Sequence, residues 1–211
     1  MTNPIRILLA DDHESVRQGL RALFATSGDV DLVADVSDGA EAITMARAMA
    51  PDVVVMDLSM PTSGLVALRQ IKTERPKAEV VVLSRHCDSA FVRAALSGGA
   101  IGYVLKQSPF SELTNAVRAA SRGEPYLDPH LASGTSPARI ERSAAQLPLS
   151  AREMEVLRRT GAGHTNKDIG SELGISVKTV EAHKANAMRK LRLTDRAAVV
   201  RFAVMQGWLD E

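Results

Sequence analysis

The chain has 211 residues, of which 45% are hydrophobic and 24% charged, and its formal net charge is +1. This length and composition are ordinary for a globular protein of one large or two small domains, and no apolar stretch is long enough to cross a bilayer. The single cysteine, Cys87, excludes an intrachain disulfide. With no signal-peptide pattern at the N-terminus, we expect a cytoplasmic protein with no membrane partner.

The first 122 residues alternate between strand-like and helix-like patterns. Short apolar runs predict β-strands near residues 5–9, 31–36, 53–56, 79–83 and 101–105, and amphipathic stretches separate them. The third and fourth runs are apolar at nearly every position, which is typical of strands covered by helices on both faces. The pattern predicts a doubly wound α/β domain with five parallel strands.

Residues 123–147 lose this periodicity and contain several prolines, which predicts a linker, with one short helix around 138–145. From residue 148 onward the pattern is purely helical, with helices expected at 151–160, 165–173, 176–191 and 195–206. This part, 148–211, contains 11 Lys/Arg against 8 Asp/Glu, whereas residues 1–122 contain 13 against 14. A small, mildly basic all-α domain therefore follows the linker.

Three predicted strands end in charge. Asp11 and Asp12 follow the first strand, Asp57 follows the third, and Lys106 follows the fifth. Because the C-terminal ends of parallel strands share one edge of a sheet, these groups are expected to converge there. Carboxylates brought so close repel one another and need a hard metal ion or the lysine to remain ionised. A divalent metal beside an aspartate nucleophile indicates phosphoryl chemistry.

The motifs ILLADDH, VVVMDLSMP, VVLS and GYVLK, in this order, resemble those of the flavodoxin-like receiver domain of two-component response regulators, over residues 1–122. The resemblance implies that Asp57 accepts a phosphoryl group from a phosphohistidine of a sensor histidine kinase. It also implies a Mg²⁺ site in which Asp12 and Asp57 are direct ligands, Asp11 holds metal-bound water, and Ser59 contributes its main-chain carbonyl.

The same resemblance assigns three further residues. It implies that Lys106 pairs with Asp57 or the phosphoryl group, that the Ser84 hydroxyl donates to a phosphoryl oxygen, and that Tyr103 is the aromatic switch residue that follows Ser84. Simpler interpretations stay open for two of them: Ser84 as a cap of the next helix, and Tyr103 as a half-buried strand residue.

Two features depart from the family pattern. The stretch from Pro61 to Gly64 is one residue shorter than the usual loop after Met-Pro. Arg85 stands directly after Ser84, where the family often has a small or unbranched apolar residue. Our hypothesis is that the guanidinium of Arg85 partly covers the phosphoryl group and alters how fast water hydrolyses it.

In the helical part, Gly174 and Ile175 separate two helical patterns, and Ser176 can cap the second, which is the order of a helix-turn-helix unit. The second helix has an apolar stripe, and an opposite face of small, polar and cationic residues that suits a DNA major groove. The stripe consists of Val177, Val180, Ala187, Met188 and Leu191. An ordinary amphipathic surface helix would show the same pattern.

The segments LSAREMEVL and NKDIGSELGISVKTVEAHKANAMRKL are similar to the DNA-binding domain of the LuxR and NarL/FixJ regulators. The resemblance implies that the helix at 176–191 enters the major groove. It also implies that Glu181, Ala182 and Ala185 stand at positions used for base reading, and that Lys178, Thr179, His183 and Lys190 match positions facing the DNA backbone. The other expected DNA-binding residues are Asn166, Lys167, Ser176 and Asn186.

The last predicted helix carries more apolar surface than a small helical domain requires, which fits either the domain's own core or a homodimer contact. The whole sequence is thus expected to encode a NarL/FixJ-type response regulator, whose receiver is a switch rather than a turnover enzyme and whose phosphorylation controls dimerisation and binding to double-stranded promoter DNA. Two alternatives remain. One is a DNA-binding regulator with a phosphorylation-independent receiver, and the other is an aspartate-nucleophile phosphatase, which usually needs a second acid where this chain has Ser59.

Overall fold

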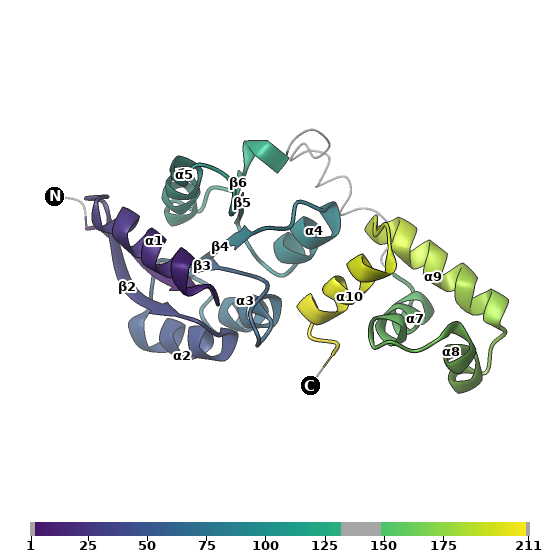
Figure 1. The fold of residues 1–211 in the computed structure, drawn as a ribbon. Coiled ribbons are helices and arrows are strands. Elements are labelled where there is room, and N and C mark those ends of the chain that lie inside the picture. The colour runs from purple at the N-terminus through teal and green to yellow at the C-terminus, as the bar shows by residue number, and fades with distance from the viewer. Residues whose placement is uncertain (1–2, 132–148, 210–211) are drawn as a thin grey trace.

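The structure is a computed structural model in which residues 3–131 and 149–209 are described. It contains a parallel α/β domain and a helical domain, which lie side by side (Figure 1). No helix in the described ranges is both long and apolar enough to span a membrane. The expected short helix at 138–145 lies outside the described residues.

The α/β domain is built on one parallel sheet. In spatial order its strands are β2 (Val30–Val36), β1 (Ile5–Ala10), β3 (Val53–Met56), β4 (Glu79–Ser84), β5 (Gly102–Leu105) and β6 (Tyr126–Leu127). The side chains of β1 alternate between the two faces, so that Ile7 and Leu9 pack on one side while Leu8 and Ala10 pack on the other. Chain order reverses between β1 and β3, and this is the point where doubly wound sheets bind their ligands.

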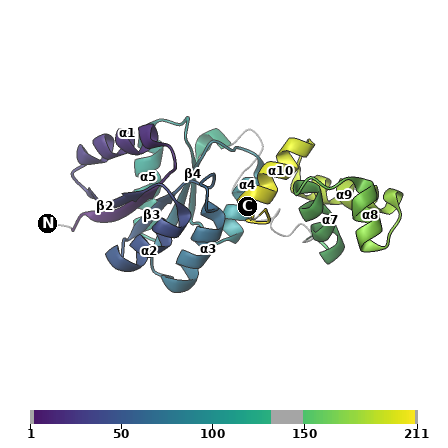
Figure 2. The same cartoon turned by 60° about the horizontal axis from the view of Figure 1, so that its bottom comes forward.

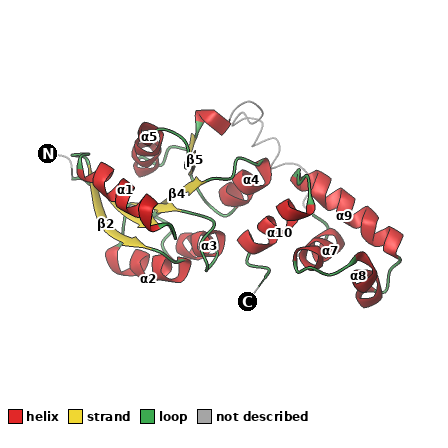
Figure 3. Ribbon diagram, in the orientation of Figure 1, coloured by secondary structure: helices red, strands yellow, loops and turns green. Residues whose placement is uncertain are grey.

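Helices cover both faces of this sheet (Figures 2 and 3). One face packs against α1 (Glu14–Ala25) and α5 (Phe110–Ser121), and the other against α2 (Gly39–Met49), α3 (Gly64–Glu74) and α4 (Ser89–Ser97). Burial on both faces explains why β3 and the centre of β4, residues 80–83, have an unbroken apolar sequence. The predicted doubly wound fold is confirmed.

The sixth strand was not predicted. Tyr126 and Leu127 pair with Gly102 and Tyr103 of β5, and a short 3₁₀ helix, η1 (Pro129–Leu131), follows. Sequence analysis placed these residues in the linker, because a two-residue strand after a proline shows no alternation. The residues from 123 to 131 therefore pack on the α/β domain.

The second domain contains α7 (Ala151–Gly161), α8 (Asn166–Leu173), α9 (Val177–Leu191) and α10 (Arg196–Met205). All four predicted helices are confirmed, and their starts are set by capping side chains. Ser150, Thr165, Ser176 and Asp195 each accept a hydrogen bond from a backbone N–H in the first turn of the helix that follows. The helix-turn-helix is the α8–α9 pair, joined through Gly174 in the left-handed conformation.

The two domains meet through α10. The ring of Phe202 on α10 packs edge-on against Phe91 of α4, with ring centroids 6.2 Å apart, and also against Trp208, at 5.7 Å. As a result, buried residues of α10 belong to the same hydrophobic cluster as the α2–α3–α4 face of the sheet. The surplus apolar surface expected on the last helix thus packs partly on its own domain and partly on the α/β domain.

Candidate functional site

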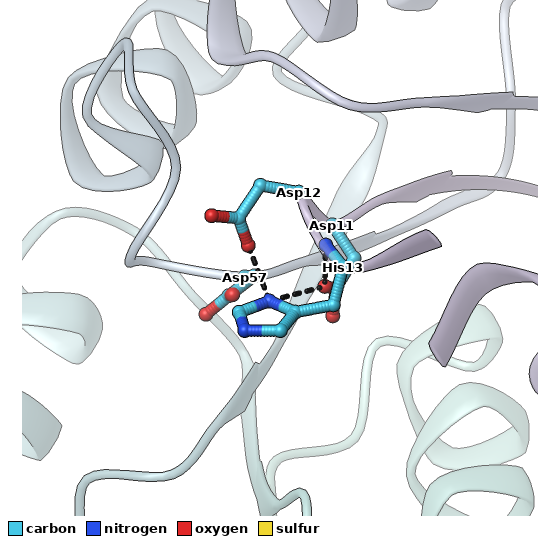
Figure 4. Close-up of side chains that lie close together, drawn as sticks. All are labelled: Asp11, Asp12, His13 and Asp57. Atoms are coloured by element: carbon cyan, nitrogen blue, oxygen red, sulfur yellow. Dashed lines mark hydrogen bonds and ion pairs between the residues drawn. The ribbon is translucent and has the colours of Figure 1, made fainter. Parts of the chain in front are cut away.

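An acidic cluster lies at the point where the strand order reverses. Asp11 follows β1 and Asp57 follows the neighbouring strand β3, whose end is tied to β1 by a hydrogen bond from the Asp57 N–H to the Ala10 carbonyl (2.8 Å). Both carboxylates are buried. Together with Asp12 and His13, which follow Asp11, they place four potential ligand atoms within 4.8 Å of one another (Figure 4).

Lys106 supplies the compensating positive charge. Its Nζ lies 2.6 Å from Oδ2 of Asp11 and 2.7 Å from Oδ2 of Asp57, and only 9% of the side chain is exposed. The backbone N–H of Lys106 donates to the carbonyl of Ser84, which fixes the end of β5 beside that of β4. The structure thus brings Asp11, Asp57 and Lys106 together as the strand-end pattern predicted.

Sequence analysis missed the role of His13 at this cluster. Its Nδ1 lies 2.5 Å from Oδ1 of Asp12 and 3.3 Å from Oδ1 of Asp11, and its backbone N–H donates to Asp11. Arg17 on α1 donates to the Asp11 carbonyl at 2.6 Å, one turn further along the chain. The position of these residues soon after Asp12 was the available signal, because residues at the start of a helix that follows a strand lie close to the end of that strand.

The loop after β3 lies directly over Asp57. The Ser59 N–H donates to Oδ1 of Asp57 (3.1 Å), and a side chain at Gly64 would overlap the Asp57 carbonyl oxygen. This close approach explains why a glycine stands at the start of α3. The oxygen-rich group formed by the three aspartates and this loop suits a hard divalent cation.

Ser84 and Tyr103 are both buried next to this site. The Ser84 Oγ accepts from the His86 N–H (3.2 Å), and the residue preceding α4 is Asp88, so Ser84 does not cap that helix. The Tyr103 hydroxyl donates to the His86 carbonyl (2.7 Å), and burial raises the pKa of this phenol. The ring is fully enclosed rather than half-buried, which corrects the simpler interpretation of Tyr103.

A small cavity of about 300 Å³ separates this site from α10. Arg85, Ser59 and His86 line it on one side, and Arg201 is among the residues that line it from α10. Burial lowers the pKa of His86, and the positive charge of Arg201 lowers it further. Arg85 itself is exposed, and its expected effect on phosphoryl hydrolysis stays a prediction.

The second candidate surface is one face of α9. The side chains of Lys178, Thr179, Glu181, Ala182 and Ala185 are all exposed. They mix cations, small residues and one carboxylate, which is a composition that can neutralise phosphates and contact base edges. The α10 contact with the other domain leaves this face of α9 open.

Several other residues expected at this surface are engaged within the protein. Lys190 pairs with Glu153 on α7 (2.7 Å), and this hydrogen bond is the main cause of the lowered pKa of Glu153. Asn186 accepts from Arg189 (2.9 Å), and the amide of Asn166 bonds to two residues of α9.

Three further residues predicted to bind DNA lie on α8, on α9 or at the start of α9. Ser176 caps α9, and its hydroxyl lies 2.8 Å from that of Thr179. Lys167 is exposed on the first turn of α8, and His183 is partly buried on α9. The predicted apolar stripe is wrong at Val177, whose side chain is 44% exposed in the first turn of α9, before the helix reaches the domain core.

Comparison with known proteins agrees with this geometry. Residues 7–118 match the response regulator receiver domain, and residues 147–203 match the bacterial regulatory proteins of the luxR family. The chain is 40% identical to the transcriptional regulatory protein LiaR of Bacillus subtilis, covering 94% of this chain and 96% of LiaR. It is 35% identical to the oxygen regulatory protein NreC of Staphylococcus carnosus, covering 98% and 100%.

Among solved structures, the chain is similar to RcsB from Salmonella enterica serovar Typhimurium bound to a promoter in the presence of a phosphomimetic. The TM-score is 0.79 at 28% identity, covering 97% of this chain and all of RcsB. Both domains and their order are therefore shared with full-length relatives. The chain belongs to the NarL/FixJ-type response regulators, in which a receiver domain is joined to a LuxR-type DNA-binding domain.

Proposed function

We propose that the chain is a phosphorylation-controlled transcriptional regulator that accepts a phosphoryl group on Asp57 from a sensor histidine kinase. The observation that carries this proposal is the buried Asp11–Lys106–Asp57 arrangement at the strand ends, in the same chain as an exposed face of α9. We also propose a cytoplasmic location, because the proposed target is promoter DNA.

The donor set fits Mg²⁺. Asp12, Asp57 and the main-chain carbonyl of Ser59 would be direct ligands, and Asp11 would hold a bound water. When bound, the ion would offset the negative charge that builds on the transferred oxygens. Two buried carboxylates face the single ammonium of Lys106, so negative charge is in excess at the site, and this excess supports the fit.

Three residues of the chain have separate roles in the phosphoryl transfer. A carboxylate oxygen of Asp57 attacks the phosphorus, the bond to the kinase histidine nitrogen breaks, and the bonding electrons stay on that nitrogen. Lys106, now paired with Oδ2 of Asp57, is within reach of a phosphoryl oxygen on the same carboxylate. The Ser84 hydroxyl accepts from the His86 N–H, and on phosphorylation its own hydrogen would donate to a phosphoryl oxygen. Because the phosphoryl group is transferred to Asp57 of the protein itself, we propose that the receiver is a switch rather than a turnover enzyme.

The contact with α10 supports a route from Asp57 to the DNA-binding domain. The Ser63 hydroxyl, in the loop over Asp57, donates to the Met205 carbonyl at the end of α10, and Arg69 on α3 donates to Gln206 (3.0 Å). Movement of this loop and of α3 on phosphorylation would break these bonds. To change occupancy substantially, the phosphoryl group must favour the released state by about 3–5 kcal/mol.

Release of α10 would make its apolar face available to a second copy of the chain. RcsB, a relative with the same domain order, has been seen as dimers bound to DNA. We propose the same assembly here, with a homodimer that forms on phosphorylation and binds two half-sites. The exposed α9 face gives specific support to one alternative, in which the unphosphorylated protein already binds DNA and the receiver serves only for dimerisation.

One experiment separates these functions. The wild type and Asp57→Ala are treated with Mg²⁺ and beryllofluoride, a phosphoryl mimic, and their mass is measured by light scattering and their binding to promoter DNA by fluorescence anisotropy. We expect dimerisation and tighter DNA binding in the wild type alone. Equal DNA binding by both proteins, with or without beryllofluoride, would support the phosphorylation-independent alternative.

A separate variant tests the proposed coupling between the phosphorylation site and α10. Arg69→Ala removes the bond to Gln206 without touching the acidic cluster, so it should raise DNA binding of the untreated protein and leave phosphorylation by acetyl phosphate unchanged. Arg75→Ala, directly after the last residue of α3, is the control: it also removes an arginine side chain, but one that donates to the Arg47 carbonyl rather than to a residue after α10. Identical DNA binding by the wild type and Arg69→Ala would show that this contact does not restrain α10.

A further inference from the structure

The amide of Asn166 connects the two helices of the helix-turn-helix. Asn166 is the first residue of α8, and its Oδ1 accepts a hydrogen bond from Nζ of Lys184 on α9 (2.9 Å). Its Nδ2 donates to Oε1 of Glu181, one turn earlier on α9 (3.4 Å). Sequence analysis expected Asn166 to contact DNA, but in the structure both ends of its side chain are already bonded within the protein.

The chemistry of the three groups fixes the direction of the amide. A lysine ammonium can only donate and an ionised carboxylate can only accept, so the carbonyl oxygen must face Lys184 and the NH₂ group must face Glu181. Glu181 and Lys184 are three residues apart on the helix, yet they form no direct ion pair within the described part of the chain. Asn166 takes the place between them, which an aspartate or an aliphatic side chain could not do.

The backbone that carries the Asn166 amide is held by the cap of α8. Thr165 caps α8 in a reciprocal capping box: its Oγ accepts from the Asp168 N–H (3.2 Å), and the Asp168 carboxylate accepts from the Thr165 N–H (3.0 Å). The backbone of Asn166, directly after this cap, is thereby held in place. Asn166 is also partly buried, whereas Glu181 is exposed.

We propose that Asn166 is a positioning residue that orients the Glu181 carboxylate for base reading, and so sets sequence specificity without contacting DNA. This inference rests on the proposed binding of α9 in the major groove. An exposed glutamate samples several rotamers, and a tether to α8 restricts them before DNA arrives. The chemical partner is an exocyclic amino group in the major groove, on cytosine or adenine, because these are the donors that a carboxylate can accept from.

The test is a selection from a random double-stranded DNA library with the full-length protein treated with Mg²⁺ and beryllofluoride. Four proteins are compared: the wild type, Asn166→Ala, Glu181→Ala and the double variant. We expect Glu181→Ala to lose its base preference at one position of each half-site. Asn166→Ala should weaken the preference at that same position by about 2- to 5-fold, as expected for one weak, exposed hydrogen bond, and the double variant should match Glu181→Ala.

Controls distinguish positioning from a phosphate contact. Lys167→Ala, at the next residue, should lower affinity for all sequences alike and reduce the salt dependence of binding, with the base profile unchanged. Asn166→Ala would refute the proposal if it behaved like Lys167→Ala, and an unchanged profile for Glu181→Ala would refute it as well. A wild type that enriches no sequence would instead refute the DNA-binding function itself. Circular dichroism melting of each variant checks that the domain stays folded.

Discussion

Replacing Lys106 by methionine should destabilise the receiver strongly, because it removes the counter-charge of two buried carboxylates. Methionine keeps most of the apolar stem of lysine and deletes only the ammonium, so the change isolates the electrostatic contribution. The side chains of Asp11 and Asp57 are 0% and 2% exposed, and both lie within 2.7 Å of the Lys106 Nζ. Water therefore cannot replace the lost charge.

The size of the effect has two independent bounds. Removing one partner of a buried ion pair typically costs about 3–5 kcal/mol. The protein can escape this cost by binding a proton in the folded state, which for an ordinary aspartate costs about 4 kcal/mol at pH 7 and about 1.5 kcal/mol at pH 5. We therefore expect a loss of about 3–4 kcal/mol in the free energy of unfolding at pH 7. The loss should be smaller at pH 5, because the folded variant then binds more protons than the unfolded chain.

Urea unfolding followed by circular dichroism measures this change in the full-length protein, at both pH values and with or without MgCl₂. Magnesium should restore part of the stability of Lys106→Met, because a bound cation replaces the lost charge. Lys178→Met, at an exposed position on α9, is the matched control and should shift stability by no more than about 0.5 kcal/mol. A loss below about 1 kcal/mol at pH 7, or one independent of pH and magnesium, would refute the electrostatic argument.

Three further predictions concern the same domain. Gly64→Ala should cost about 3 kcal/mol or more and slow phosphorylation by acetyl phosphate, because the new methyl group overlaps the Asp57 carbonyl; a variant with wild-type melting and labelling would contradict this close approach. Burial raises the pKa of Asp128, but hydrogen bonds, including one from the Leu105 N–H, lower it more, so its stabilisation is present above pH 4 and lost below. Asp128→Ala should accordingly lose about 1–3 kcal/mol at pH 7 and progressively less as the pH falls below about 4 in urea titrations, and an equal loss at every pH would count against this assignment. Arg85→Ala should change the acyl-phosphate half-life by at least about 2-fold, since a guanidinium beside the phosphoryl group alters water access, and equal half-lives would rule the hypothesis out.

Most of the fold could be predicted because its signals are local. The five longer strands are mainly apolar runs whose lengths are visible in the sequence, and the helices of the second domain begin at capping residues such as Ser176. β6 could not be predicted, since two residues after Pro125 carry no periodic pattern and only pairing with β5 makes them a strand. The packing of α10 against α4 could not be predicted either, because the sequence of an apolar helix face does not indicate which surface covers it.

The residues of the candidate site also differ in how well the sequence predicts their positions. Residues at strand ends, such as Asp57 and Lys106, are placed by topology, so their convergence follows from the strand order. Long-range side-chain partners do not follow from it. Nothing in the sequence indicates that Lys190 pairs with Glu153, 37 residues earlier, or that Asn166 bonds to α9. For these residues a helical wheel gives the face, but the tertiary structure decides the partner.

The short strand β6 also bears on how the receiver can be separated from the rest of the chain. Tyr126 and Leu127 pair with the outer side of β5, and just beyond them the Asp128 carboxylate accepts from the Leu105 N–H. A receiver cut after residue 122 would lose all three residues and leave β5, a strand without charged residues, as an uncovered edge. Such an edge is a template for pairing with other chains and for aggregation. The self-sufficient receiver therefore extends to Leu131, ten residues beyond the end of its final long helix.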